Sequence, residues 1–423
     1  MRSLVAGLRM QGGLLDLGFE EILNHLGLFY EKVEDNSSSY QVELSSEDFS
    51  RAGGTTLEEI VQLLSGLHDP ERDDFMYPVV NEFELKVLAE IKKRYSDCGI
   101  PLVRKWYWPN QKVFCVILTH DVDYLFQPPP PRGSLRKTIP SLIRYGLGWL
   151  TGDIRVCNVL QLGKREKAKG FISTFFFMVD YGTRTEILGR LVRIPELKEF
   201  EVGLHGSPSA ADSSLALTKQ RSRLEQMTSR RILANRFHYL VSSPPFTWRK
   251  LEEAGFTSDC TSCCRESPGF KDGICFPFHP IDIFQERRRT VIEIPTSFMD
   301  SPFIQDVEKA RHKMNRLLEV VTKFNGCLVL NFHNGYQDPK IYPQYVGFYD
   351  WVLETIASTQ GVWVANVSDV CKWWLSRERT QLRKNALLYD TAKNDVHIVS
   401  PLAESRLVLC VENKEIHKLI YHA

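Results

Sequence analysis

Residues 113–123 read VFCVILTHDVD, an apolar run followed by two aspartates. The first six residues have the length and composition of a buried strand, and Asp121 and Asp123 come at its carboxyl end. Barrels and open sheets of the α/β class place their functional sites at this end of their strands. Because alternate residues of an extended chain point the same way, both carboxylates are expected to face one site. The alternative interpretation is that they cap a turn or the next helix.

Two further apolar runs end in a histidine. FEVGL (200–204) is followed by His205, and CLVLNF (327–332) is followed by His333. Imidazole and carboxylate groups together suit Zn²⁺ or a similar divalent ion, and a further carboxylate and histidine would serve as general base and general acid. A single histidine at a strand end is commonly structural. Three strands that each end in His or Asp favour a catalytic site that binds a divalent metal.

The chain from residue 113 onward alternates short apolar runs with helical stretches, a pattern typical of βα units around a parallel sheet or barrel. The expected strands are VFCVIL, FISTFFFMV, FEVGL, RFHYL, VIEIP, CLVLNF and VWVANV. Residues 1–110 are predicted to be a mostly helical accessory region, with helices at 57–67 and 82–95. Residues 111–376 form the predicted barrel. Residues 377–423 form a small β-rich tail, in which DVHIVSP pairs with SRLVLCVEN as a hairpin.

The segment after the two aspartates is rich in proline and then basic. QPPPPRGS (127–134) is expected to form a surface loop, because consecutive prolines favour the extended polyproline conformation. Residues 134–168 begin SLRKTIPSLIRYGLGWL and are predicted to form an amphipathic helix that caps the barrel or covers a cleft. The alternative for such a basic amphipathic stretch is contact with a membrane surface.

The composition is that of an ordinary globular protein. Of 423 residues 43% are hydrophobic, and 53 Lys and Arg nearly balance 52 Asp and Glu, for a formal charge of +1. A charge this small gives no long-range attraction for nucleic acid, so no nucleic-acid partner is expected. No apolar run reaches the roughly 18 residues of a membrane helix, and charged residues interrupt the N-terminal stretch, so neither an integral membrane segment nor a secretory signal is predicted. Ten cysteines without a signal favour the cytoplasm.

Other patterns are weaker. Cys260, Cys263, Cys264 and Cys275 have a spacing compatible with zinc, but they lack the paired CxxC form of a zinc ribbon, and ordinary core thiols are the simpler interpretation. The aromatic residues 106–108 would either stack on a sugar or pack between domains. The sequence contains no Walker A motif, dinucleotide-binding glycine fingerprint or GxSxG elbow, which argues against phosphate-loop, nicotinamide and serine-hydrolase enzymes.

Six motifs in order resemble the polysaccharide deacetylases of carbohydrate esterase family four, and most closely a divergent bacterial branch of them. The motifs are THDVD, STFFFMVD, EVGLHGS, NRFHYL, EEAGFTSD and LNFH. The resemblance covers roughly residues 70–375. It implies a distorted (β/α) barrel of the deacetylase type and a metal-dependent hydrolase that acts on a non-peptide amide bond. The implied substrate is a carbohydrate, an N-acetylated amino sugar of a polysaccharide or glycan precursor.

Matched position by position, the family's motifs imply a role for each of five residues. Asp121 corresponds to the general base, and Asp123 to the carboxylate that binds the metal. His205 corresponds to the first histidine ligand. Arg236 corresponds to the arginine that orients the base, and His333 to the histidine that protonates the leaving amine.

The sequence departs from the family pattern at Ser209. A second histidine ligand usually lies four residues after the first, where the two share one face of a helix. We expect His238 in RFHYL to complete the metal site instead, because residues i and i+2 of a strand-like run face the same side and Arg236 is expected to face the site. The alternatives are that water takes the place of this ligand, or that metal and activity have been lost.

Two other residues and two other function classes remain. Asp259 and Asp300 match family positions of uncertain role and are interpreted as supporting structure. A glycosyltransferase that uses Asp-x-Asp with Mn²⁺ or Mg²⁺ would need a nucleotide pocket and no proton-donating His333. A barrel without catalytic activity would bind a glycan without turnover.

Overall fold

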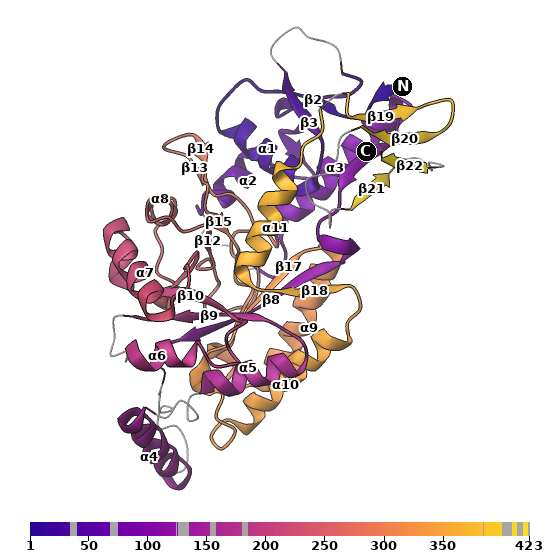
Figure 1. The fold of residues 1–423 in the computed structure, drawn as a ribbon. Coiled ribbons are helices and arrows are strands. Elements are labelled where there is room, and N and C mark those ends of the chain that lie inside the picture. The colour runs from indigo at the N-terminus through magenta and orange to yellow at the C-terminus, as the bar shows by residue number, and fades with distance from the viewer. Residues whose placement is uncertain are drawn as a thin grey trace.

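A computed structural model describes most of the chain, and Figure 1 shows its strands at the centre, helices around them and the two termini close together. The described residues are 1–33, 40–67, 75–123, 125, 135–152, 158–179, 185–383, 385–399, 408–412 and 418–421. The proline-rich run 127–134 lies outside them. Among the described helices, none has both the length and the hydropathy needed to cross a membrane.

A nine-stranded parallel sheet forms the centre of the molecule. Its order is β15-β12-β11-β10-β9-β8-β17-β16, with β18 paired to β8 in addition. The strands are β8 (Phe114–Val122), β9 (Ser173–Phe177), β10 (Glu201–Gly206), β11 (Ala234–Phe237), β12 (Ser258–Asp259), β15 (Ile292–Glu293), β16 (Phe298–Met299), β17 (Cys327–Asn331) and β18 (Val362–Ala365). The predicted βα organisation is confirmed.

Burial explains why these strands are visible in the sequence. All nine residues of β8 are buried, and parallel strands covered on both faces are continuous apolar runs. The two end strands of the sheet, β15 and β16, are consecutive in the chain and joined only by residues 294–297. The sheet therefore curls into an open, distorted barrel whose strands all end on one rim.

Helices lie around the sheet, and one of them, α4 (Leu135–Thr151), projects from the barrel (Figure 1). The others are α5 (Asn158–Ala168), α6 (Thr185–Leu191), α7 (Ser214–Thr228), α8 (Phe246–Glu253), α9 (Val307–Phe324), α10 (Pro343–Ser358) and α11 (Val367–Arg379). Three of them begin at a side chain that accepts a backbone N–H of the first turn, namely Ser213, Asp306 and Asn366. Two short strands, β13 (Ile281–Asp282) and β14 (Arg287–Arg288), form a hairpin outside the barrel.

The segment before the barrel combines helices with a small sheet. Its helices are α1 (Leu14–Leu26), α2 (Leu57–Leu64) and α3 (Val79–Asp97), and the latter two occupy the positions predicted from the sequence. A parallel sheet in the order β3-β2-β4 joins residues Tyr30–Val33, Ala6–Arg9 and Glu43–Ser45. This sheet is not apparent from the sequence, because strands of three or four residues are too short to show periodicity.

The C-terminal strands pair with the N-terminal segment. The strand β19 (Leu387–Asp390) pairs with β1 (Arg2–Ser3) on one side and with β20 (Asp395–Ile398) on the other. Next to β20 lies β22 (Lys418–Tyr421), and β21 (Leu409–Glu412) pairs with β7 (Leu102–Lys105). The predicted hairpin between DVHIVSP and SRLVLCVEN is therefore wrong. The strand β21 pairs with β7, which precedes it by about 300 residues, and no local pattern reveals such a partner.

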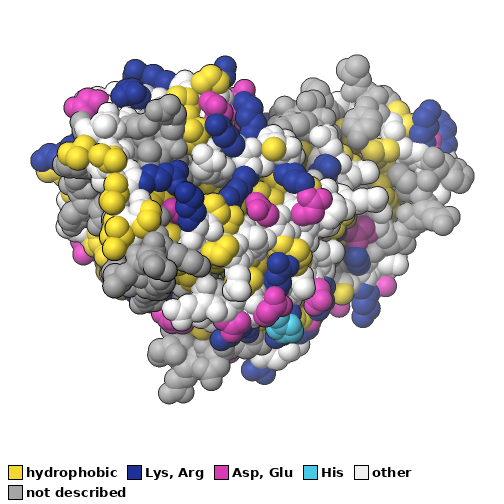
Figure 2. Space-filling view, turned by 90° about the horizontal axis from the view of Figure 1, so that it is seen from below, with side chains coloured by type: hydrophobic (Ala, Val, Ile, Leu, Met, Phe, Trp, Pro, Cys, Tyr) yellow, Lys and Arg dark blue, Asp and Glu magenta, His cyan; other side chains and the backbone are white. Residues whose placement is uncertain are grey.

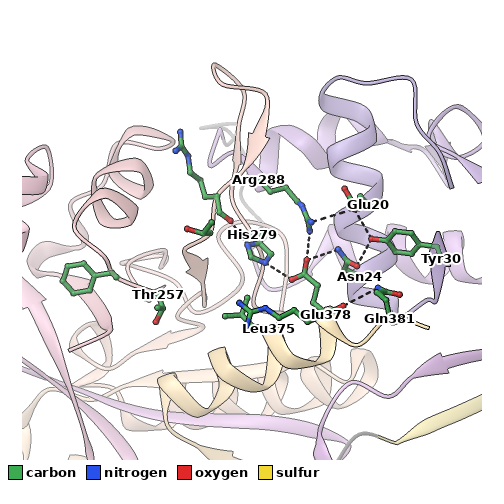
Figure 3. Close-up of a pocket in the computed structure, with 13 residues that line it drawn as sticks. Glu20, Asn24, Tyr30, Thr257, His279, Arg288, Leu375, Glu378 and Gln381 are labelled. Carbon is green, nitrogen blue, oxygen red and sulfur yellow. Dashed lines mark hydrogen bonds and ion pairs between the residues drawn. The ribbon is translucent and has the colours of Figure 1, made fainter. Parts of the chain in front are cut away.

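A network of paired charges joins α1 to the barrel. Arg288 on β14 donates to Glu21 (2.7 Å) and to Glu378 on α11 (3.0 Å), and His279 lies 2.8 Å from the same Glu378. Arg288, Glu378 and His279 line a cavity of about 540 Å³ together with Glu20 (Figure 3). Because the charges are paired with one another, we interpret this cavity as part of the interface between the N-terminal segment and the barrel.

His25 is at the buried end of this network. Its Nδ1 lies 2.6 Å from Glu84 and its Nε2 3.0 Å from Glu21, and its side chain is fully buried. Burial alone would lower the pKa of His25, but the charges of Glu84 and Glu21 raise it from 6.5 to about 9. The imidazole is therefore charged in the folded protein at neutral pH.

We predict that this charge makes stability depend on pH. A pKa raised by folding gives stability that is present in full below about 6.5 and is lost as the pH rises through about 9. The loss is at most about 3 kcal/mol of unfolding free energy. Denaturant unfolding on either side of this range measures it, and His25→Gln should flatten the difference. The exposed His312→Gln is the control, and an equal pH dependence in wild type and His25→Gln would contradict the assignment.

Candidate metal and catalytic site

Four strands of the sheet, β8, β10, β11 and β17, deliver polar side chains to one rim of the barrel. Asp121 and Asp123 come at the end of β8, His205 at the end of β10 and His333 after β17. Together with residues from the turn after β11, they line a cavity of about 170 Å³. The structure thus brings together residues that are up to 212 positions apart in the sequence, as the convergence of parallel strand ends predicts.

Asp121 is held on both of its oxygens. Its Oδ1 accepts a hydrogen bond from Arg236 (2.9 Å), and its Oδ2 accepts one from the amide of Asn331 (2.7 Å). Burial would raise the pKa of Asp121, but the charge of Arg236, together with that of His333, holds it well below its usual range. Asp121 is therefore ionised at all physiological pH values.

Arg236 is fully buried, and its guanidinium group donates hydrogen bonds to four residues. Its guanidinium donates to Asp121, to the hydroxyls of Thr119 and Thr296, each at 2.8 Å, and to the carbonyl of Cys260 at 3.0 Å. A guanidinium forms such a fan of hydrogen bonds because its five donors are fixed in one plane. Asn331, the second partner of Asp121, was missed by the sequence analysis. Its position in LNFHN, at the last residue of β17, was the available signal.

Asp123, His205 and His238 form the group whose spacing fits a metal ion. One ligand atom from each lies within 4.8 Å of the others, and no other such group occurs among the residues described. His205 donates its Nδ1–H to the carbonyl of Arg236 (2.9 Å), because a carbonyl oxygen only accepts. Its Nε2 is then left with a lone pair and lies 3.3 Å from Asp123 Oδ1.

The chemistry of these donors fits a divalent cation. Asp123 Oδ1 is buried and has no hydrogen-bond partner among the described residues, which is costly unless a cation binds there. Two imidazoles and one carboxylate are the usual three protein ligands of a catalytic zinc site, whose fourth position is left to water. Burial lowers the pKa of His238, which favours the neutral imidazole that a metal requires.

His238 joins this group from a turn, whereas the sequence predicted a strand at this position. The strand β11 ends at Phe237, and His238 begins the 3₁₀ turn His238–Leu240, so the expected alternation along a strand is wrong here. Its Nε2 nevertheless lies 3.7 Å from Asp123 Oδ1. Ser209 lies in a separate turn, where its hydroxyl is 3.1 Å from that of Ser207, and it does not line the cavity.

His333 faces the group from the other side of the cavity. Asp300 accepts from its backbone N–H (2.7 Å) and lies 2.5 Å from its Nδ1, so that Nε2 points toward Asp121 at 3.8 Å. Burial would lower the pKa of His333, but the charges of Asp300 and then Asp121 raise it to about 10. Asp259, by contrast, bonds to Asn235 and Thr261 and does not line the cavity.

The weaker sequence indications do not form sites in the part of the chain that the structure describes. Cys260, Cys263 and Cys275 are buried and belong to no group with metal spacing. Trp108 is buried and its ring contacts those of Trp363 and Trp374, so packing is the role of at least this aromatic residue.

Comparisons with known proteins find similarity in structure only. No family model and no curated protein matches the sequence significantly. Similar solved structures include a Mycobacterium smegmatis protein assigned to the polysaccharide deacetylases, with 19% identity and a TM-score of 0.47 over 66% of this chain and 96% of that chain. The allantoinase PuuE has 15% identity and a TM-score of 0.47 over 63% and 92% of the two chains.

A pseudoenzyme of the CE4 family from Bacillus anthracis is also similar, with 14% identity and a TM-score of 0.33 over 62% and 66% of the two chains. The structural neighbours thus include members of the family that the motifs resemble.

We predict that His238→Ala weakens zinc binding by about tenfold or more, because it leaves two protein ligands in place of three. Isothermal titration with Zn²⁺ measures the affinity of the purified protein. His312→Ala removes an exposed histidine of α9 and is the matched control. If His238→Ala and His312→Ala both bind Zn²⁺ like the wild type, His238 is not a ligand.

Proposed function

We propose that this protein is a metal-dependent hydrolase that removes an N-acetyl group from an amino sugar of a polysaccharide or glycan precursor. The observation that supports it is a pair of titratable groups with opposite pKa shifts facing each other beside the metal-type group. The pKa of Asp121 is lowered and that of His333 is raised. Groups whose environments push their pKa values apart in this way are the mark of an acid and base assignment.

Asp123, His205 and His238 would hold the metal ion. A divalent metal at such a site polarises an amide carbonyl and makes a bound water more acidic. Asp121 has a lowered pKa, so it is always ionised but accepts protons only weakly. A weak base of this kind needs a water made more acidic by a metal.

Asp121 is the general base of the proposed reaction. Its Oδ2 faces the cavity, 3.9 Å from His205 Nε2 and 3.8 Å from His333 Nε2. There it accepts a proton from the attacking water, whose oxygen forms the new bond to the acetyl carbon. Arg236 and Asn331 fix the carboxylate in this orientation and hold its charge.

His333 is the general acid. Asp300 fixes its ring and keeps it protonated, so that Nε2 carries a proton to the cavity. When the bond between carbon and nitrogen breaks, His333 donates this proton to the departing amine of the sugar. The products are acetate and the free amino sugar.

The rim beside the cavity offers a surface for a sugar ring. Tyr239 lines the cavity, is 62% exposed and stacks on the ring of His238 at 3.9 Å between centroids. Its φ of 60° and that of Leu240, 56°, are strained values for residues with bulky side chains. Backbone strain of this kind is found at functional sites, where the surrounding structure holds a side chain in place. The aromatic face of Tyr239 would stack on a sugar ring.

Acetate release from chitooligosaccharides and from nucleotide-linked N-acetylhexosamines tests the proposal. We expect release that stops when a chelator removes the metal and resumes when Zn²⁺ is restored. Binding of a nucleotide sugar without acetate release would favour a glycosyltransferase, and binding of the glycan without turnover a non-catalytic barrel.

We predict that Asp121→Asn keeps the metal but lowers turnover by at least about a hundredfold, the usual scale for a lost general base. Metal content and acetate release of the same preparation give both values. Asp212→Asn, an exposed aspartate before α7, is the control. If Asp121→Asn loses its metal, Asp121 is a ligand and the two aspartates exchange roles.

A second prediction concerns pH. Because the raised pKa keeps His333 protonated up to about 10, the rate should hold on the alkaline side and fall only as the pH passes this value. Asp300→Asn removes the charge that raises the pKa, so the alkaline limb of kcat/KM should move to lower pH. An unchanged alkaline limb in Asp300→Asn would show that His333 is not the acid.

A further inference from the structure

The helix α4 is attached to the rim of the catalytic cavity by one face. Tyr145 is buried, and its hydroxyl lies 3.0 Å from Asn158 Oδ1 and 3.1 Å from Asp338 Oδ2. Gly148 and Gly152 are buried on the same side of the helix, three and seven residues later. Asp338 itself follows His333 by five residues, so α4 lies beside the mouth of the site. In Figure 1 the helix projects from the body of the barrel.

The opposite face of α4 is apolar and exposed. Its side chains recur at spacings of three and four residues and are between 42% and 66% exposed. They are Ile139, Leu142, Ile143, Leu147 and Leu150. A helix of a globular protein normally turns such a stripe toward the core. Here the stripe faces away from it, which marks an interaction surface rather than a packing element.

Basic residues accompany this stripe in the sequence, and in the structure an arginine lies at one end of α4. Residues 124–152 contain no Asp or Glu but four Lys or Arg. At the end of α4, a Cβ built on Gly152 would lie 3.8 Å from the guanidinium of Arg190. Arg190 lines a cavity of about 560 Å³ between α6 and α7 with Arg193 and Arg223, and among the described residues Glu186 is the one acidic side chain that lines it. Figure 2 shows hydrophobic and basic side chains next to one another on this face of the molecule.

We propose that the apolar stripe of α4 and the neighbouring arginines Arg190, Arg193 and Arg223 dock the protein on an anionic lipid bilayer. A helix with an exposed apolar face and basic surroundings lies in the plane of the membrane, with the apolar side chains among the acyl chains and the cations at the lipid phosphates. A stripe on a projecting helix is convex, and a fluid bilayer conforms to such a surface without a complementary groove.

The docking is local, because the formal charge of the whole chain is only +1 and gives no general attraction to anionic lipids. It does not depend on the proposed activity. One consequence does rest on that activity: a docked protein would hold its cavity next to the membrane, where it reaches an amino sugar carried by a lipid.

Flotation with vesicles tests the docking. The full-length protein should bind vesicles of phosphatidylcholine and phosphatidylglycerol in equal parts, and bind phosphatidylcholine vesicles much less. Ile143→Asp with Leu147→Asp should weaken binding to the anionic vesicles by about tenfold or more, since both changes place charge in the apolar stripe. Leu85→Asp is the matched control, because Leu85 is an exposed leucine of α3 at the other end of the molecule.

The arginines give a second arm. Arg190→Glu with Arg193→Glu should weaken binding, and added salt should weaken wild-type binding, because both reduce the attraction to lipid phosphates. Arg51→Glu with Lys93→Glu changes the total charge equally at exposed positions elsewhere and should leave binding unchanged. Equal binding of all variants, or no preference for anionic vesicles, would overturn the proposal. So would a wild-type dimer, seen by light scattering, that the double aspartate variant dissociates, since a second copy would then cover the stripe.

Discussion

The buried pair of Arg236 and Asp121 is the interaction on which the rest of the site depends. Arg236 is fully buried, and its 2.9 Å contact with Asp121 joins the ends of β8 and β11 across the inside of the barrel. A buried charge is tolerated only if it is paired and its remaining donors have acceptors. Here Thr119, Thr296 and Cys260 accept the other hydrogen bonds of Arg236. Removing one partner would leave the other charge buried alone, at a cost of about 3–5 kcal/mol.

The same arginine also positions the metal-type group. Its side chain orients Asp121, while its backbone carbonyl accepts the Nδ1–H of His205 and so directs the lone pair of Nε2 toward Asp123. One residue therefore fixes both the base and a ligand, and the next turn of the chain delivers His238. On the far side of the cavity, the negative charge of Asp300 orients His333 and stabilises its positive charge, as Arg236 orients Asp121 and stabilises its negative charge. The two pKa values are shifted in opposite directions as a result.

The sequence predicted the parts of this arrangement that follow from strand ends. Apolar runs followed by Asp121, Asp123, His205 and His333 mark strand termini, and parallel strands bring their termini to one rim. Contacts between side chains of strands that are far apart in the sequence could not be predicted from it. The hydrogen bond from Asn331 to Asp121 is an example. The turn at His238, the short strands of β2, β3 and β4, and the pairing of β21 with β7 were missed for a related reason. Each is fixed by tertiary contacts that leave no local periodicity.

Diffraction from crystals soaked in Zn²⁺, with data collected at the zinc absorption edge, tests directly whether Asp123, His205 and His238 bind a metal ion. The account predicts one strong anomalous peak bonded to Asp123, His205 and His238, with the imidazole nitrogens at about 2.0–2.1 Å and Asp121 outside the coordination shell. An intact site without a peak at these three side chains, or a peak bonded to Asp121 in place of His238, would contradict it.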